Sequence, residues 1–328
     1  MEWTEDVLGP DFSVHQVAVS GRGVHTTISL VRYNPGPSAP VRGSVLYVHG
    51  WSDYFANPEL ARHVAAAGYH FYALDFHGYG RNLTDSILAT GQIPGMADDL
   101  NEYAEDFQAA RTAMEQDGAP SDPDHLVVIA HSTGGLAMSL LLMEQPGQVA
   151  GLALATPWIA PQGFAWLDNV IRAVAHVMPK AWQDRRIPVP VNTNYHRTLS
   201  ADREGSWQVD PRWRPKNSFP ITMNLLASTA RARLRLLELG RTGQGVGAPV
   251  LLQISSRSLL VPWWDDRMHA ADTVLDVRAI RRRIGLLSRT PTVISYPGAI
   301  HDVHRSAPSI RGRAFADLQA WLSELPLA

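Results

Sequence analysis

One serine lies in a sequence context that could activate it for nucleophilic attack. Ser132 follows an apolar run at residues 126–129 and precedes a segment with helical spacing at residues 134–144. A nucleophile on a sharp strand-to-helix turn needs small residues two positions away on either side, and Ala130 and Gly134 meet that need. The N-terminus of the following helix would favour negative charge developing on the serine oxygen. This context favours a nucleophile over a simple helix-capping serine.

A serine nucleophile needs a general base, and two histidines after the last apolar run could supply it. His301 and His304 follow a predicted strand at residues 291–296 and the turn at Pro297 and Gly298. The chain there passes over the carboxyl end of the strand, where a base would have to lie. The position of His301 in the turn makes it the preferred base, with His304 as the alternative.

The carboxylate that would orient this histidine has four candidates. Asp265, Asp266, Asp272 and Asp276 all follow the strand-like segment that ends near Ser255. Each could reach the histidine from a loop, so the residues alone leave the choice open. A serine, a histidine and an aspartate arranged in this way catalyse acyl transfer through a covalent intermediate.

These residues require a scaffold of buried strands that alternate with helices. Short, continuously apolar runs that end in polar or small residues are typical of strands buried on both faces of a parallel sheet, and they occur at residues 45–48, 71–74, 126–129 and 152–155. Helical spacing lies between them, at residues 57–67, 96–116 and 134–144. This alternation predicts a doubly wound α/β sheet. Residues 13–20 and 24–33 predict an antiparallel edge hairpin, and residues 291–296 and 311–325 a final strand and helix.

The composition narrows the class of protein further. The chain has 328 residues, 45% of them hydrophobic and 18% charged, which is typical of a globular protein with a large core. A net charge of −2 excludes a strongly basic nucleic-acid binder, and the absence of cysteine excludes disulfides and thiolate metal sites. No metal-ligand spacing occurs, so neither a metal nor another cofactor is expected. The N-terminus lacks the pattern of a signal peptide, which predicts a soluble, cytoplasmic protein.

A long insertion interrupts the α/β pattern between Pro157 and Pro249. We predict a core at residues 1–157 and 249–328 and a helical lid at residues 158–248. The segment from Thr156 to Ala248 carries 13 Lys and Arg against 6 Asp and Glu, so it is basic. It also contains half of the ten tryptophans. An aromatic-rich insertion broken by prolines is typical of a lid that walls an apolar pocket.

Three motifs in chain order resemble the α/β-hydrolase superfamily, and in particular its monoacylglycerol-lipase-like, serine-aminopeptidase-type (S33-like) serine hydrolases. They are VLYVHG at residues 45–50, AHSTGG at residues 130–135 and GAIHD at residues 298–302. In that family the triad runs Ser, Asp, His along the chain, and a lid is inserted between the sixth and seventh strands. The resemblance implies an α/β-hydrolase fold. It also assigns the acid to Asp272, because residues 272–276 resemble the family's Asp-x-x-x-Asp, with Asp276 as an early helix residue.

The resemblance extends to the groups that would bind a developing oxyanion. Residues 49–51, His-Gly-Trp, resemble the family's oxyanion loop, which implies that the backbone N–H groups of Trp51 and Thr133 serve as donors. His49 is expected to shape this loop from below. Two features depart from the family pattern: Ala130 replaces the first glycine of G-x-S-x-G, and the loop at residues 258–270 is longer than usual.

Together these features predict a serine hydrolase that cleaves a carboxylic ester of a hydrophobic acyl group, of monoacylglycerol or lysophospholipid type, through an acyl-enzyme intermediate. The residues expected to line the substrate pocket are Trp51, Trp207, Trp213 and Trp263. The basic lid is expected to contact a membrane surface or lipid transiently. The same triad could instead serve a C–C bond hydrolase, a peptidase, an acyltransferase or a haloperoxidase, and a non-catalytic receptor of the same fold is a further alternative.

Overall fold

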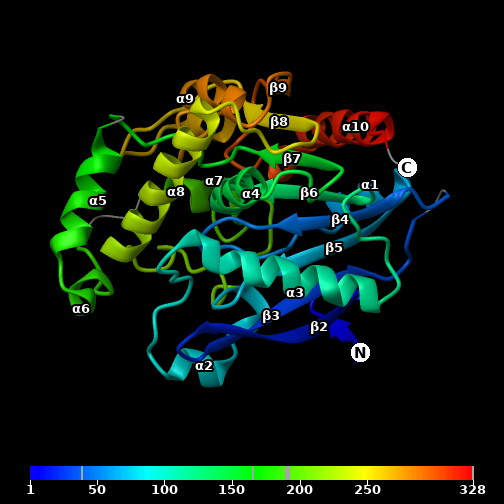
Figure 1. Ribbon diagram of the computed structural model, residues 1–328, viewed down its shortest axis with the longest axis horizontal. Coiled ribbons are helices and arrows are strands. Elements are labelled where there is room, and N and C mark those ends of the chain that lie inside the picture. The colour runs from blue at the N-terminus through cyan, green and yellow to red at the C-terminus, as the bar shows by residue number, and fades with distance from the viewer. Residues whose placement is uncertain (38–39, 165, 189–192, 327–328) are drawn as a thin grey trace.

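A computed structural model of the chain describes residues 1–37, 40–164, 166–188 and 193–326. Within these residues it contains one nine-stranded mixed sheet with helices on both faces (Figure 1). The strands are β1 (Thr4–Asp6), β2 (Gly9–Arg22), β3 (His25–Tyr33), β4 (Gly43–Val48), β5 (Tyr69–Asp75), β6 (Leu126–His131), β7 (Gly151–Ala155), β8 (Val250–Ser255) and β9 (Thr292–Tyr296). Their order across the sheet is β1-β2-β3-β5-β4-β6-β7-β8-β9.

The sheet has an antiparallel edge and a parallel centre. β2 and β3 form the predicted hairpin, and β3 joins β5 in antiparallel register. From β5 through β4, β6, β7, β8 and β9 the neighbouring strands are parallel. The doubly wound sheet predicted from the apolar runs is therefore present. The short β1 was not predicted, because three residues are too few to show an alternating pattern.

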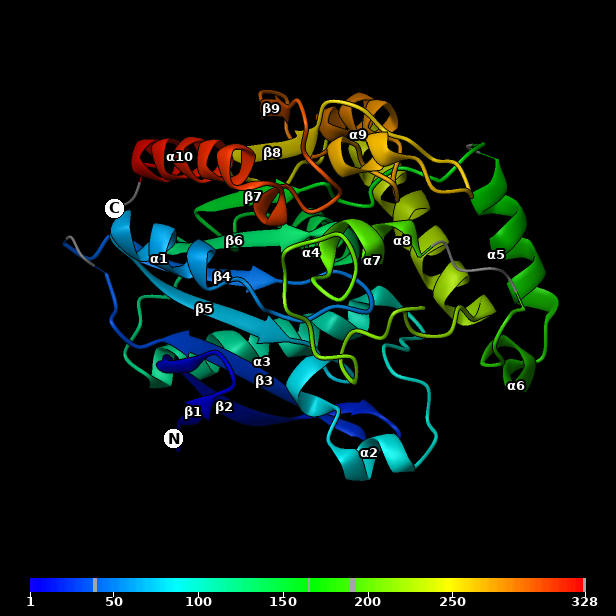
Figure 2. The same cartoon turned by 180° about the vertical axis from the view of Figure 1, so that it is seen from behind.

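The helices cover both faces of the sheet. They are α1 (Pro58–Ala66), α2 (Asp85–Ala89), α3 (Tyr103–Gln116), α4 (Ser132–Glu144), α5 (Leu167–Val177), α6 (Lys180–Gln183), α7 (Asn194–Leu199), α8 (Met223–Arg241), α9 (Val277–Arg283) and α10 (Pro308–Glu324). α3 and α4 pack into the larger hydrophobic core on one face, and α1 and α10 pack into a second core on the other face (Figures 1 and 2). Both cores bury apolar side chains of the central strands, which makes the carboxyl edge of the sheet a rigid support for a site.

Local sequence signals explain where the helices next to this edge begin. The Asn57 side chain accepts a hydrogen bond from Leu60 N at 3.2 Å, and Pro58 occupies the first turn of α1. α4 begins directly at Ser132 after β6. Nearly every residue of α4 is buried, because the helix lies between the sheet and α8.

The predicted insertion contains α5, α6, α7 and α8 and connects β7 to β8. In the order of this chain these are the seventh and eighth strands, because β1 adds one strand at the N-terminus. In Figure 2 the arrowheads of β4, β5 and β6 point toward the side on which α7, α8 and α5 lie. The insertion is continuous with the core, since Leu236 and Leu239 of α8 are buried in the larger hydrophobic core. Among the described residues, every helix is too short or too polar to cross a membrane.

Candidate active site

The turn between β6 and α4 holds Ser132 in a strained backbone conformation. Its φ is 51°, a left-handed value that is uncommon for residues other than glycine. The neighbouring loop approaches so closely that a Cβ on Gly134 would lie 2.1 Å from His49 O, and one on Gly50 would lie 2.9 Å from Ser132 Cβ. Glycine at both positions therefore allows the turn to lift the serine hydroxyl above the sheet edge.

Ser132, His301 and Asp272 form a continuous hydrogen-bonded chain. His301 Nε2 lies 3.1 Å from Ser132 Oγ, and His301 Nδ1 lies 2.8 Å from Asp272 Oδ2. A carboxylate only accepts hydrogen bonds, so Nδ1 carries the proton and Nε2 accepts from the serine hydroxyl. The other carboxylate oxygen of Asp272 accepts from Val274 N and Leu275 N, which fixes the orientation of the fully buried carboxylate. This geometry allows His301 to remove the proton of Ser132.

The rival histidine and aspartates have other partners. His304 Nε2 lies 2.8 Å from Gln253 Oε1, and burial lowers the pKa of His304. Asp276 accepts hydrogen bonds from two backbone N–H groups at the start of α9, which makes it a helix cap. Asp265 pairs with Arg267 on the surface, and Asp266 accepts from Trp264 Nε1. Of the candidate bases and acids, the structure therefore brings His301 and Asp272 to Ser132.

The loop after β4 is held in place from below by His49. His49 Nδ1 lies 2.7 Å from Gly50 O, and its Nε2 accepts a hydrogen bond from Phe76 N at 3.2 Å. Burial lowers the pKa of His49, which keeps the imidazole neutral and able to accept. Trp51 on this loop and Thr133 in the first turn of α4 both line the cavity that contains Ser132. The first N–H groups of a helix have no partner within the helix, so Thr133 N is free of helical hydrogen bonding.

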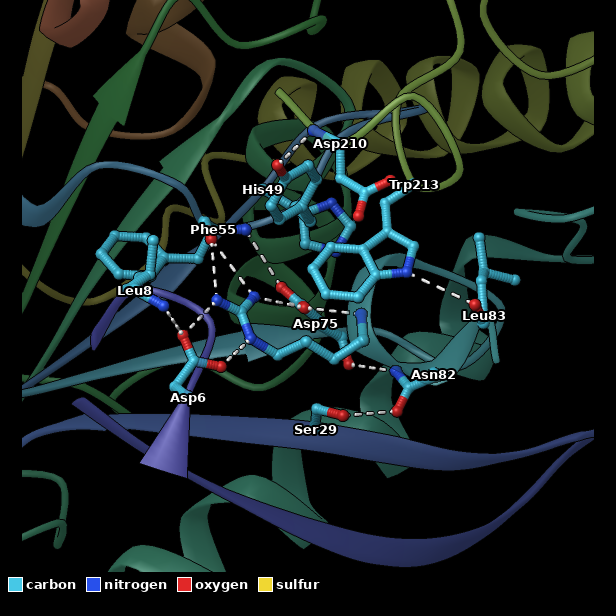
Figure 3. A network of polar contacts seen from close by, with 12 residues as sticks. Asp6, Leu8, Ser29, His49, Phe55, Asp75, Asn82, Leu83, Asp210 and Trp213 are labelled. Carbon is cyan, nitrogen blue, oxygen red and sulfur yellow. Dashed lines mark hydrogen bonds and ion pairs between the residues drawn. The ribbon is translucent and has the colours of Figure 1, made fainter. Parts of the chain in front are cut away.

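A buried ion network also contacts this loop, and it was not predicted from the sequence. Arg81 pairs with Asp75 at 2.7 Å and with Asp6, and it donates a hydrogen bond to Phe55 O. Phe55 N in turn donates to Asp75 Oδ1 at 3.0 Å (Figure 3). The network ties the N-terminal strands to the loop of residues 49–55. In the sequence its one visible signal is an aspartate, Asp75, that directly ends a buried strand.

The cavity at Ser132 has a volume of about 480 Å³. Its polar lining residues include Asp53, His131, Ser132, Thr133 and His301. Its walls are mainly apolar and come from the insertion and from the loops after β8: Trp158, Ile221, Leu225, Leu226, Leu260, Val261, Pro262, Val274 and Leu275. A groove of about 580 Å³ between α5 and α8 lies outside this site and contains none of the three hydrogen-bonded residues. The described residues contain no group of three or more His, Asp or Glu side chains arranged to hold a metal.

Three of the four tryptophans expected in the pocket lie elsewhere, which corrects that expectation. Trp51 lines the cavity, and Trp158, which had not been selected, lines it as well. Trp207 donates from Nε1 to Arg305 O at 2.7 Å, and Trp213 is buried and donates to Leu83 O. Trp263 is 65% exposed. Trp207 and Trp213 anchor the insertion to the core, because a buried indole N–H needs an acceptor and backbone carbonyls of the core provide one.

The fold and this geometry define an α/β-hydrolase with a serine, histidine and aspartate at the carboxyl edge of the sheet. The chain belongs to the serine aminopeptidase, S33 family, which matches residues 39–307. It is 26% identical over 276 residues to a monoacylglycerol lipase of Mycolicibacterium smegmatis, with 81% of this chain and 84% of the relative covered. The predicted α/β-hydrolase fold and the predicted family are thereby confirmed.

Solved structures show the same fold. A monoglyceride lipase of Saccharomyces cerevisiae superposes with a TM-score of 0.66 at 16% identity, covering 99% of both chains. A carboxyl esterase of Bacillus coagulans has the same TM-score at 14% identity and covers 95% of this chain and 98% of its own. At this level of identity the likeness establishes the arrangement of strands and helices alone.

Proposed function

We propose that the protein is a serine hydrolase that cleaves carboxylic esters of hydrophobic acyl groups, of monoacylglycerol or lysophospholipid type. The observation that carries this proposal is the series of hydrogen bonds from Asp272 through His301 to Ser132, together with the mainly apolar cavity that His301 and Ser132 line. Membership in the family and the similarity to a monoacylglycerol lipase support an ester as the substrate.

The residues suggest a two-step reaction. Ser132 Oγ attacks the ester carbonyl carbon while His301 Nε2 takes the hydroxyl proton, and Asp272 stabilises the resulting imidazolium. The bond to the alcohol oxygen then breaks, and His301 gives the proton to this oxygen. A water molecule next attacks the acyl-enzyme, its proton passes to His301, and the carboxylic acid leaves as Ser132 recovers its proton. In both steps Trp51 N and Thr133 N would donate to the oxyanion.

The apolar walls of the cavity give an expectation for acyl-chain preference. With p-nitrophenyl esters of increasing length, kcat/KM should rise by up to about fourfold per methylene until the chain fills the cavity, since burying a methylene contributes about 0.8 kcal/mol. Leu226→Ala removes part of this wall and should flatten the rise. Steady-state rates over the ester series, together with monoacylglycerols, would measure both effects.

Leu237→Ala is the matched control for this series, because Leu237 lies on the same helix as Leu226 but lines the groove between α5 and α8. It should leave the chain-length profile unchanged. Equal profiles for L226A and the wild type would contradict the assignment of the acyl group to this wall. Turnover of amides or C–C substrates in place of esters would instead favour one of the other reactions that the triad supports.

We also propose that the insertion contacts an anionic lipid surface through an exposed apolar face formed by α5, α6 and the residues just before α5. Phe164, Trp166, Val177 and Trp182 are each more than half exposed, although large apolar side chains are usually buried. Exposed arginines flank this face at positions 172, 185 and 186. In Figures 1 and 2 α5 and α6 lie at one end of the molecule, beyond α8 and away from the sheet. An exposed apolar face with basic flanks and tryptophans is suited to the interface of an anionic bilayer.

The double substitution W166S/V177S should weaken binding to vesicles that contain phosphatidylserine by about tenfold or more, because it removes the apolar groups that would enter the bilayer. Cosedimentation with vesicles would measure this, and hydrolysis of a water-soluble short ester should stay unchanged. The control V7S/V41S alters two exposed valines on the core and should bind like the wild type. Equal binding by W166S/V177S and the wild type would rule out this face.

A further inference from the structure

A cluster of four buried charges lies beside the candidate active site. Arg305 contacts Asp53 and Asp302, each at 3.2 Å, and also donates a hydrogen bond to Tyr54 O. Arg214 approaches the same carboxylate, with Nε 3.2 Å from Asp53 Oδ1. All four side chains are less than one-tenth exposed, so solvent does little to screen their interactions. Two carboxylates and two guanidinium groups balance each other.

The insertion supplies one of these charges. Arg214 follows Trp213 in a segment that is fastened to the core: Asp210 N donates to Tyr54 OH, and Phe219 N donates to Ser52 Oγ. Figure 3 shows Asp210 and Trp213 beside the core network. The guanidinium of Arg214 lies 4.8 Å from the ring centroid of Tyr195, and the ring of Tyr195 packs edge-on against His301. This part of the insertion is thus held next to the reacting groups.

The charge of Asp53 affects the electrostatic field at the oxyanion site, because Asp53 lies two residues after Trp51 in the sequence and lines the same cavity. Burial raises the pKa of its carboxyl, but Arg305 and Arg214 lower that pKa to about 2, so Asp53 is ionised at neutral pH. Burial also lowers the pKa of His131 to about 4 and lowers that of His49, so neither imidazole adds positive charge there. An unbalanced carboxylate at this position would oppose the negative charge that forms on the substrate oxygen.

We propose that Arg214 is a positioning residue of the insertion that neutralises Asp53 and thereby keeps the field at the oxyanion site favourable. The inference rests on the proposed function of Ser132 and adds a group outside the triad. Arg305 cannot fulfil this role alone, because it also balances Asp302. Removing Arg214 would leave the cluster with one net negative charge beside the developing oxyanion.

The test compares Arg214→Met with the double variant D53N/R214M in their reaction with a small fluorophosphonate. In this reaction Ser132 Oγ forms a bond to phosphorus, fluoride leaves and His301 takes the proton, so no acyl pocket is involved. R214M should lower the second-order rate by about tenfold to a hundredfold. D53N/R214M should recover most of this loss, because it removes the unbalanced charge. R214K keeps the charge and should stay within about threefold of the wild type.

The recovery of the reaction rate in D53N/R214M distinguishes an electrostatic role of Arg214 from a packing role. If Arg214 only filled space, the double variant would be no faster than R214M, since Asn adds no contact that Met could use. That outcome, or an unchanged rate in R214M, would overturn the proposal. Failure of the wild type to react would instead contradict the proposed nucleophile. Arg233→Met is the stability control: it breaks a buried ion pair with Asp168 in the same insertion, and it should lower Tm without the same loss of rate.

If R214M does not fold, the comparison of R214K with R214Q gives the same decision. Both side chains are flexible and polar, but Lys alone carries the charge. A rate for R214Q equal to that of R214K would overturn the proposal, and a slower R214Q whose rate is restored by D53N would support it. Thermal unfolding of every variant would show the folded fraction to which each rate refers.

Discussion

Ser132→Ala is expected to abolish ester hydrolysis, lowering kcat by about a million-fold. The substitution removes the oxygen that would form the acyl-enzyme, which is the hydroxyl 3.1 Å from His301 Nε2. The fold should persist, because alanine keeps the Cβ and the backbone conformation of the turn and removes a hydroxyl rather than core volume. Turnover of a short p-nitrophenyl ester and labelling by a fluorophosphonate would both measure the loss, and thermal unfolding would report the fold.

Ser139→Ala provides the matched control on the same helix. Ser139 is fully buried, and its hydroxyl donates to Gly135 O at 2.6 Å within α4. Its removal should affect stability by about 1 kcal/mol and leave turnover near the wild-type value. Substantial activity in S132A would remove the basis of the proposed function, and labelling of S132A by the probe would point to a different nucleophile.

His301→Ala should lower kcat by at least about a thousandfold. Without the imidazole, the proton of Ser132 has no acceptor as the oxygen attacks, and the leaving alcohol has no donor. His301 is 2% exposed and forms hydrogen bonds with both Ser132 and Asp272. Its loss therefore also removes the hydrogen bond between Asp272 Oδ2 and the imidazole. Single-turnover measurements would show the acylation step slowed, while the affinity for a non-reactive ester analogue should change little.

His304→Gln is the comparison that tests which histidine is the base. His304 is as buried as His301, but its Nε2 bonds to Gln253 and its ring stacks on Phe315. Glutamine can donate a hydrogen bond to Gln253, so the cost should fall on stability and kcat should change by less than about tenfold. If H304Q lost more activity than His301→Ala, the role of the base would move to His304.

Elements with a strong local pattern could be predicted from the sequence. The apolar runs predicted the central strands, and the helical spacing at residues 57–67 predicted α1, which Asn57 caps. These features depend on neighbours in the chain: a strand buried on both faces must be apolar throughout, and a helix needs a cap within its first turn. The selection of Ser132 has the same origin, because its strained turn requires small residues nearby in the sequence. His301 could be selected by its position on the turn after the last strand.

The tertiary structure decides which side chains come into contact when they are far apart in the sequence. The acid illustrates this: four aspartates follow β8, and the backbone N–H groups of Val274 and Leu275 orient the carboxylate of Asp272 toward His301. The tryptophans show the limit of composition, because the carbonyls that accept from Trp207 and Trp213 lie 98 and 130 residues away along the chain.

No local sequence pattern predicts the ion cluster around Asp53. Arg214 and Arg305 reach this aspartate from positions 161 and 252 residues further along the chain. The sequence predicted a serine nucleophile on an α/β sheet with a basic, aromatic insertion, since these predictions depend on periodicity, local motifs and composition. The charges that the insertion places near Ser132 depend on how the chain packs. The strength of a buried ion pair is set by the distance between the charges and by the exclusion of water. Spacing along the sequence determines neither of these.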